Sequence, residues 1–194
     1  IASGFHLFVA SRIAMLDIFM LCAVAVAYWQ LAAAMREPEK GRWRLALAGI
    51  ALGLAMGAKW NAIPLAMVPG LAFLVLRWRA GRRRLMLSRR GMPVPGMTLV
   101  EAALWLGVVP LAVYAATFIP GFLYAREAIP DGLIAHHRFM LDLQEQVKKA
   151  HPYQSTWQQW VLNTRAIWYL YEPVDGAQRG VLLVGNPLTM WLGL

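Results

Sequence analysis

Residues 45–76 read LALAGIALGLAMGAKWNAIPLAMVPGLAFLVL and are apolar on both sides of one polar triplet, Lys59-Trp60-Asn61. A single helix over the whole stretch would be about 48 Å long, which is too long for one simple crossing of a bilayer. The stretch therefore predicts a hairpin of two short helices, 45–58 and 62–76. Its turn falls at the triplet and is helped by Pro64.

Apolar runs on either side extend this pattern. They predict a first span at residues 8–35, another at 99–118 and the start of a further transmembrane helix at 181–194. Of the 194 residues, 59% are hydrophobic and only 15% are charged, whereas about a quarter are charged in a soluble domain. The predicted fold class is all-α, a multi-pass transmembrane helical protein. One hairpin helix carries a glycine at every fourth position, which favours close packing in lipid: Gly49, Gly53 and Gly57.

Basic residues are concentrated in two short segments, 36–44 and 77–90, which hold eleven of the nineteen Lys and Arg side chains. This clustering follows the positive-inside rule for cytoplasmic loops, so nucleic acid is not an expected partner. If both segments are inside, then Arg12, Asp17, the Lys59 triplet and the long segment 119–180 all lie at the outer surface. One tilted helix in place of the hairpin would put the two basic segments on opposite sides, against the charge rule.

The segment 119–180, predicted to be an extracytoplasmic loop, has balanced charge, with six basic and six acidic residues. Within it, residues 131–150 place apolar and charged side chains on opposite arcs, which predicts an amphipathic helix lying flat on the outer membrane surface. His136 and His137 are adjacent, so their rings point about 100° apart on a helix. We therefore expect interfacial packing of these rings and no metal site.

Charged residues in the spans are the first candidates for function, because charge inside a membrane is costly. Arg12 and Asp17 lie five residues apart on the first span and could pair with each other or with other helices. The alternative is that Arg12 only reaches the headgroups. Lys59 stands at a helix break, where its ammonium group suits a phosphate, with the same alternative.

Residues 151–172, HPYQSTWQQWVLNTRAIWYLYE, are both aromatic and polar. Flat rings with polar tips suit a membrane interface and also a sugar. Arg165 could bind phosphate through its planar fork or pair with Glu172, and His151 could shuttle protons or simply end a helix. We expect this segment to face a lipid-borne substrate, and both transport and group transfer remain open on these grounds.

Four stretches together resemble the protein O-mannosyltransferase family, in the GT-C class of membrane glycosyltransferases. They are SRIAMLD at 11–17, GLAMGAKW at 53–60, HPYQSTW at 151–157 continuing to WYLYE at 168–172, and GVLLVGNP at 180–187 followed by Trp191. Their order and spacing fit the family. The lack of a soluble sugar-binding-like domain before His151 resembles the bacterial members. The chain begins without Met and ends inside an apolar run, so we take it for an internal fragment.

The resemblance implies an inverting transfer of mannose from a polyprenyl-phosphate-mannose donor to Ser or Thr hydroxyls of exported proteins. It assigns the donor phosphate to Lys59, Arg12 and Arg165, and a supporting catalytic role to Arg12 and Asp17. The catalytic base is expected upstream of this chain, so the fragment alone is expected to be inactive. The other candidates would line a groove for carrier and acceptor: Trp60, Asn61, His151, Tyr153, Ser155, Trp157, Trp160 and Glu172.

The resemblance also implies an integral protein of the bacterial inner (plasma) membrane with its active side extracytoplasmic. Expected partners are the lipid-linked donor, secreted or membrane protein acceptors, membrane lipid and, through those acceptors, the export machinery. No cofactor is expected, since the lipid-linked sugar is itself a substrate. The alternatives are a GT-C transferase with a lipid or other acceptor, and a membrane transporter or lipid-binding scaffold. Polar residues gathered at one surface favour transfer, because transporters usually hold theirs near the bilayer midplane.

Overall fold

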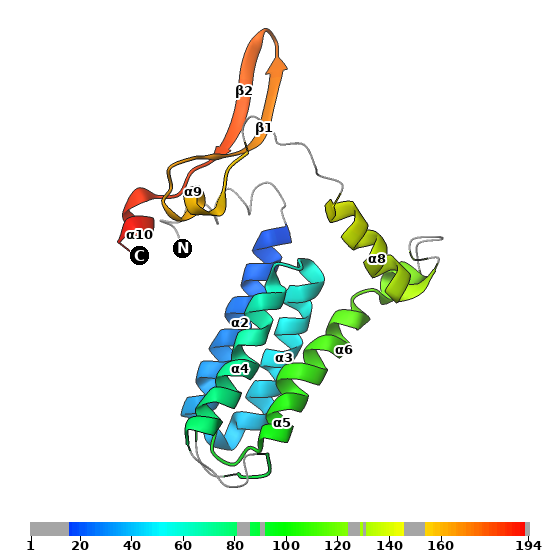
Figure 1. Ribbon diagram of the computed structural model, residues 1–194, viewed down its shortest axis with the longest axis vertical. Helices are drawn as coiled ribbons and strands as arrows, with labels where there is room; N and C mark the ends of the chain where they lie inside the picture. The colour runs from blue at the N-terminus through cyan, green and yellow to red at the C-terminus, as the bar shows by residue number, and fades with distance from the viewer. Residues whose placement is uncertain are drawn as a thin grey trace. The chain divides into compact units, whose positions relative to one another are not determined.

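The computed structural model describes residues 16–80, 86–89, 92–123, 129, 131–145 and 154–192. The chain divides into two compact units, one over Phe19–His136 and the other over Ile1–Ile18 with His137–Leu194. In the described residues the first unit is a bundle of helices, and the second contains a β-hairpin with short helices (Figure 1).

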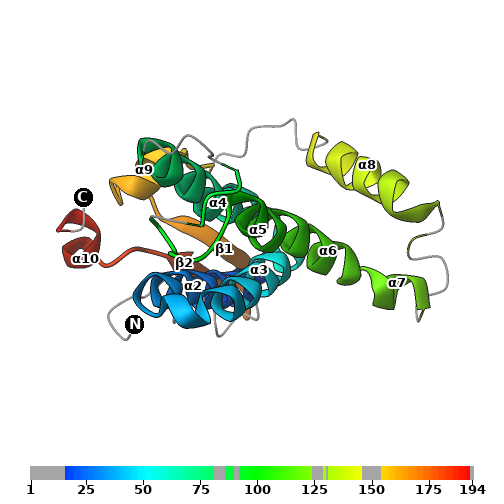
Figure 2. The same cartoon turned by 90° about the horizontal axis from the view of Figure 1, so that it is seen from below.

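The bundle consists of long apolar helices that pack side by side (Figure 2). They are α2 (Leu16–Arg36), α3 (Gly41–Ala58), α4 (Ala62–Arg79) and a composite helix formed by α5 (Leu99–Ala103), η2 (Leu104–Val108) and α6 (Val109–Ala116). Among the described helices, three are long and apolar enough to cross a membrane: Leu16–Arg36, Ala62–Arg79 and Leu99–Leu123. The predicted multi-pass helical class is thus confirmed.

The turn between α3 and α4 falls at the triplet Lys59-Trp60-Asn61, here called the Lys59 turn. Lys59 ends α3 in extended backbone geometry, with φ −161° and ψ 133°. Pro64 lies in the first turn of α4, where its missing N–H is not needed. The two helices begin four residues earlier and end three residues later than the apolar stretch 45–76 alone suggested, because flanking arginines are also helical.

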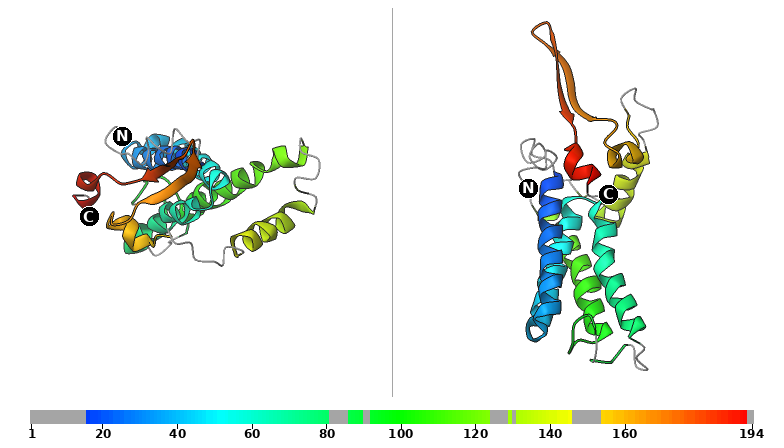
Figure 3. Two further views of the ribbon diagram at one scale, coloured as in Figure 1. Left: turned by 90° about the horizontal axis from the view of Figure 1, so that it is seen from above. Right: turned by 90° about the vertical axis from the view of Figure 1, so that its left-hand side faces the viewer.

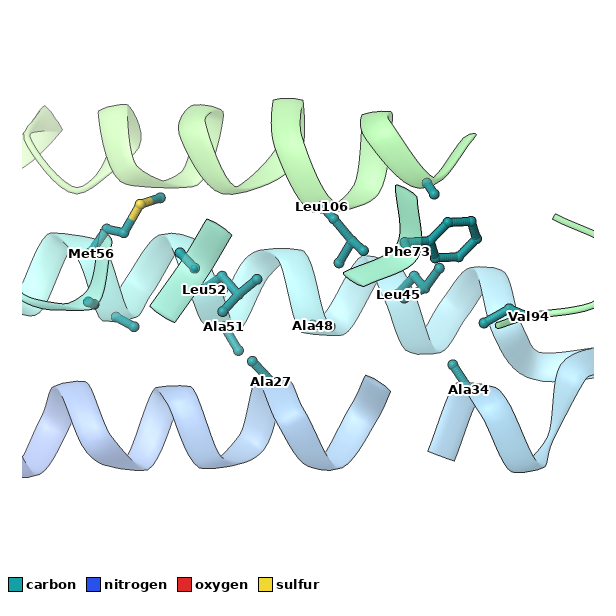
Figure 4. Packing of buried hydrophobic residues seen from close by; sticks show 14 of the residues in the cluster. Ala27, Ala34, Leu45, Ala48, Ala51, Leu52, Met56, Phe73, Val94 and Leu106 are labelled. Carbon is teal, nitrogen blue, oxygen red and sulfur yellow. The ribbon is translucent and has the colours of Figure 1, made fainter. Parts of the chain in front are cut away.

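The helix α3 lies between α2 and the composite helix and forms the centre of the core (Figure 4). Leu45, Ala48, Leu52 and Ala55 on α3 are fully buried. Its glycines allow this close contact. A Cβ atom at Gly53 would lie 2.6 Å from Cβ of Val113, and the corresponding atoms at Gly49 and Gly57 would meet Trp105 and Thr117. The predicted role of the glycine repeat in helix packing is confirmed, and its partner is the composite helix.

Two prolines interrupt the helical hydrogen bonding of the bundle, and each interruption is accommodated. Pro110 cannot donate to a preceding carbonyl, and just before it the helix widens into η2, where the N–H of Val109 bonds to the carbonyl of Leu104 five residues back. Pro69 lies inside α4 and leaves the carbonyl of Leu65 without its helical donor. The hydroxyl of Tyr28 on α2 donates to that oxygen at 3.0 Å.

The end of the bundle where α2 and α4 finish and α3 and α5 begin is here called the basic end. A short turn, η1 (Pro38–Lys40), joins α2 to α3 there. Arg44 donates to Glu37 and to the buried Gln30, both at 3.0 Å, and Lys40 lies 3.3 Å from Glu37. The Arg44 guanidinium and the Lys40 ammonium lower the pKa of Glu37 below its ordinary value.

Arg77 departs from the expectation that the arginines of 77–90 are solvated. It is fully buried, its guanidinium donates to the carbonyls of Ser88 and Met97, and it lies 5.4 Å from the ring centroid of Phe73. A buried guanidinium is tolerated only when its donors are used in this way. Arg77 therefore attaches the described residues 86–89 and 92–98 to the end of α4.

Glu101 has a similar role at the start of the composite helix. It forms a capping box with Thr98, in which the Thr98 N–H donates to Glu101 at 3.1 Å and the Glu101 N–H donates to the Thr98 hydroxyl at 3.0 Å. Arg42 on α3 donates to the same carboxylate at 2.8 Å and to the carbonyl of Gly96 at 3.3 Å. Basic side chains at this end thus hold helix ends together as well as contributing charge.

After α6 the chain continues through α7 (Ile119–Leu123) to α8 (Gly132–Glu145). A helix is thus present over most of the range predicted to be amphipathic, with none of its residues buried. Residues 146–150 of that range lie outside the described residues. Its contact with a membrane surface stays a prediction.

The second unit adds two strands that the all-α assignment did not include, within residues expected to form loop up to 180 and helix from 181. Strands β1 (Ile167–Val174) and β2 (Ala177–Leu183) form an antiparallel hairpin (Figure 3). Its turn residues Asp175 and Gly176 have φ of 52° and 75°, which is the type I′ geometry that matches strand twist. The signal in the sequence is the Asp-Gly pair directly after Ile167–Val174, a run rich in aromatic and β-branched residues.

The hairpin also changes where the last helix begins. The expected transmembrane helix at 181–194 does not start at Val181, because Val181–Leu183 complete β2. Helix α10 (Pro187–Trp191) starts six residues later, with Asn186 as its N-cap and its side chain accepting from the N–H of Leu188 at 3.0 Å. A span beginning at α10 stays a prediction.

Candidate functional site

The Lys59 turn is held to the composite helix by one polar contact between aromatic residues. The indole Nε1 of Trp60 donates to the hydroxyl of Tyr114 at 2.8 Å. This bond fixes the orientation of the half-buried Trp60 beside Lys59. It also gives the indole N–H and the phenol oxygen a hydrogen-bond partner at the end of an apolar bundle. Tyr114 was not among the predicted site residues. A tyrosine within an apolar run was its only signal in the sequence.

Further aromatic residues continue from Tyr114 along one side of the bundle. The rings of Tyr114 and Phe118 meet edge to face at 5.2 Å, and those of Phe118 and His136 at 5.8 Å. Such geometry is favourable for aromatic pairs. His136 of α8 is therefore engaged in aromatic packing, and its expected place at the membrane interface stays a prediction.

Lys59 and Asn61 flank Trp60 in the Lys59 turn. Lys59 is half-buried and Asn61 is exposed. Asn61 precedes α4, and its side chain makes no capping bond to the first turn. The N-terminal dipole of the 18-residue helix α4 adds positive potential next to the Lys59 ammonium. The turn thus combines a cation, an amide and an indole at one surface, a set that can bind an anionic or polyhydroxylated group.

In the second unit, Ser155, Trp157 and Trp160 lie together around α9 (Trp157–Val161). The indole Nε1 of Trp160 donates to the hydroxyl oxygen of Ser155 at 2.7 Å, and Gln159 accepts from the N–H of Thr156 at 2.9 Å. Both tryptophans remain largely exposed. Ser155 and Trp160 are thus in direct contact, and their role in lining a groove for carrier and acceptor stays a prediction.

Asn163 fixes α9 to Gly185, the second residue after β2. It adopts a φ of 52° and its side chain makes two bonds with the backbone of Gly185, donating at 2.8 Å and accepting at 3.0 Å. The indole of Trp191 donates to the carbonyl of Leu162 at 3.0 Å. These bonds join residues 22 and 29 positions apart, so α9, the hairpin and α10 share one framework.

The other candidates are distributed as follows. Arg165 is exposed just before β1, and Glu172 lies within β1 opposite Arg179 of β2. The pairing of Arg165 with Glu172 stays a prediction. Asp17 lies in the first turn of α2. Arg12, His151 and Tyr153 lie outside the described residues. Within the described ranges, no three His, Cys, Asp or Glu side chains gather in a way that could hold a metal ion.

An apolar groove of about 360 Å³ lies between α4 and the composite helix. Gly70 and Gly107 contribute to opposite walls, and a side chain at either position would meet open space. The remaining lining is apolar and includes Met67, Leu74, Leu99 and Leu106. The groove can take an unbranched or methyl-branched hydrocarbon chain.

Together these features define a helical membrane protein with a cationic and aromatic turn at one end of its bundle. The chain belongs to the dolichyl-phosphate-mannose-protein mannosyltransferase family, whose model matches residues 1–125. The model of the C-terminal four TMM region of protein-O-mannosyltransferase matches residues 130–194. The resemblance drawn from the four motifs is thus confirmed.

Curated relatives include proteins named polyprenol-phosphate-mannose–protein mannosyltransferase. The one from Mycobacterium tuberculosis (strain ATCC 25618 / H37Rv) is 28% identical over 96% of this chain, and the one from Mycolicibacterium smegmatis (strain MKD8) is 27% identical over 95%. The chain spans about half the length of these relatives, 45% in each case. No solved structure matches the chain.

Proposed function

We propose that this chain is part of an enzyme that transfers mannose from a polyprenyl-phosphate-mannose donor to Ser or Thr hydroxyls of exported proteins. The observation that carries the proposal is that two family models match the chain in order, over residues 1–125 and 130–194. The names of the mycobacterial relatives describe mannose transfer from polyprenol-phosphate-mannose to protein for those proteins. They favour it over a lipid acceptor and over transport.

The chemistry would be an inverting displacement at the anomeric carbon. The acceptor oxygen attacks C1 of mannose from the face opposite the phosphate, the bond from C1 to the phosphate oxygen breaks, and polyprenyl phosphate leaves. The hydroxyl proton passes to a base, which we place upstream of this chain. No cofactor is proposed, because the donor already carries its leaving group. Lys59, with Arg12 and Arg165 as further candidates, would stabilise the charge that develops on the phosphate.

The remaining candidates would arrange the substrates around that centre. Asp17 would orient Arg12, and Trp60, Asn61, Ser155, Trp157 and Trp160 would shape the carrier and acceptor groove together with His151, Tyr153 and Glu172. The apolar groove between α4 and the composite helix suits the isoprenoid chain, since Gly70 and Gly107 leave room for its methyl branches. We place the active side outside the plasma membrane, where acceptors would arrive from the export machinery.

The test uses the full-length protein in membranes with radiolabelled mannosyl-phosphoryl-polyprenol and a Ser/Thr-rich peptide. Lys59→Ala should lower kcat/KM about 100-fold, as expected for one charge-stabilising group. Lys40→Ala, which removes an exposed lysine at the basic end, should stay within threefold of wild type. Transfer unchanged by Lys59→Ala would refute the role of Lys59, whereas donor binding without transfer to any peptide would refute the reaction itself.

A further inference from the structure

The two edges of the β1–β2 hairpin differ in their capacity to pair with another strand. The loop of two residues makes Val174 and Ala177 the closing hydrogen-bonded pair, and such pairs alternate with non-hydrogen-bonded ones. Residues in the non-hydrogen-bonded pairs direct their N–H and C=O groups away from the partner strand. On β1 these residues include Tyr171 and Pro173.

Pro173 blocks the outer edge of β1, because proline has no N–H to offer and is tolerated in a strand only at such an edge. The outer edge of β2 has no such block. The alternation places Gln178, Gly180 and Leu182 there, each with an outward N–H and C=O, and all three residues are exposed. Among the described residues the sheet has only β1 and β2, so no third strand covers this edge.

The edge of β2 is also held in a defined place. The Asn163 side chain binds the backbone of Gly185, two residues after β2 ends. Asn163 itself follows α9, the helix that carries Trp157 and Trp160. The end of β2 is thus fixed to the end of α9. A two-stranded hairpin alone is of marginal stability, and a third strand would add main-chain hydrogen bonds to it. Gly180, at the middle of the open edge, allows another backbone to approach without a side chain in the way.

We infer that the outer edge of β2 binds the acceptor polypeptide as an added antiparallel or parallel strand. This inference rests on the proposed function, which requires a polypeptide acceptor. Main-chain pairing fits an enzyme whose acceptors share hydroxyl groups rather than one sequence, since the bonds come from the backbone and are independent of side chains. In a paired strand, the side chains at every second position point to the same face. Ser or Thr residues at these positions would therefore be presented to the enzyme in the same orientation.

The first test leaves the protein unchanged. A Thr-containing acceptor peptide is methylated at one backbone nitrogen at a time along six successive residues, and kcat/KM is measured with the full-length protein. Strand addition predicts that every second methyl group lowers kcat/KM about tenfold, because only alternate N–H groups point to β2. Losses without a period of two would overturn the inference.

The second test changes the edge itself. Gln178→Pro removes one outward N–H without touching the β1–β2 hydrogen bonds, and Gln178→Ala is its matched control. Gln178→Pro should raise the KM for the peptide about tenfold while donor binding is retained, and Gln178→Ala should match wild type. Equal KM values for both variants would overturn the inference while the transferase proposal stands. Absence of transfer by wild type would overturn both.

A second copy of the chain is the competing occupant of this edge. Gln178→Cys, in a full-length protein with Cys22 and every other cysteine replaced by Ser, distinguishes it, because pairing of β2 with β2 around this position would bring the new thiols of two copies close together. The acceptor proposal expects no disulfide-linked homodimer under mild oxidation and protection of the thiol from maleimide by excess peptide. A homodimer, or labelling that peptide does not slow, would overturn it.

Discussion

The hydroxyl of Tyr28 on α2 donates to the carbonyl oxygen of Leu65 on α4, the oxygen that Pro69 deprives of its helical donor. In a membrane, water does not satisfy such an oxygen, so a neighbouring helix must. Tyr28 and Pro69 also line the same apolar pocket between α2 and α4. A side chain on one helix thus compensates for a proline in another.

Tyr28→Phe should destabilise the bundle by about 1–3 kcal/mol, the cost of a carbonyl left without a donor where lipid replaces water. The measurement is thermal unfolding of the full-length protein in detergent. The matched background is Pro69→Ala, which restores the N–H for Leu65. In that background the same substitution should cost much less. Equal losses in both backgrounds would show that the tyrosine hydroxyl does not serve Leu65.

Gly53 and Gly70 should respond oppositely to alanine. A Cβ atom at Gly53 would lie 2.6 Å from Cβ of Val113 and 2.7 Å from the carbonyl oxygen of Pro110, whereas one at Gly70 meets nothing within 4 Å. Gly53→Ala should therefore destabilise the protein by about 1–3 kcal/mol through overpacking. Gly70→Ala should be neutral or stabilise by up to about 1 kcal/mol through helix propensity. Thermal unfolding of the two variants compares them directly, and a loss at Gly70 as large as that at Gly53 would contradict the packing argument.

Arg77→Met should loosen the loop at the basic end. It removes charge-assisted hydrogen bonds to Ser88 and Met97, a loss of about 2–4 kcal/mol. Limited proteolysis within residues 86–98 should become faster and the unfolding temperature should fall. Arg79→Met is the control, because Arg79 is an exposed arginine on the same helix. Similar protease sensitivity in both variants would argue against a specific role for Arg77.

Glu37 predicts a pH dependence of stability. Its pKa is lowered by Arg44 and Lys40, so its folded pKa lies below its unfolded one. The stabilisation is fully present above the unfolded pKa and is lost as pH falls through the folded pKa. The difference in unfolding temperature between wild type and Glu37→Gln should therefore shrink between pH 7 and acidic pH. A difference that stays constant would show that the carboxylate charge contributes nothing.

Trp60→Phe should weaken donor use if the Lys59 turn binds the donor phosphate, as proposed. The variant keeps an aromatic ring but loses the 2.8 Å bond to Tyr114, so Lys59 would be less well positioned. We expect the KM for the lipid-linked donor to rise about three- to tenfold. Tyr114→Phe should have the same effect, and the double variant should be no worse than either single one. Additive losses would mean that the two residues act separately.

Local properties of the sequence determined the helical part of this protein. Apolar length predicted the spans, and the Lys59 triplet with Pro64 predicted where α3 turns into α4. The repeat of Gly49, Gly53 and Gly57 predicted close packing. These features depend on hydropathy, backbone freedom and side-chain size within one segment. They can therefore be predicted without knowing which other segments pack against it. The pair Asp175-Gly176 is a local signal for the β-hairpin. It was outweighed in the prediction because the apolar residues Val181–Val184 also resemble the start of a span.

The tertiary structure alone decided which partner each polar group has. Tyr28 to Leu65, Trp60 to Tyr114 and Asn163 to Gly185 join residues 37, 54 and 22 positions apart, and no periodicity links them. Arg77 looked like one more cation of a cytoplasmic loop, and only the folded loop shows it buried against carbonyl groups. A hydrogen bond depends on two atoms meeting at about 3 Å. That meeting is set by how helices and loops pack, because the sequence specifies each donor and acceptor but not which of them become neighbours.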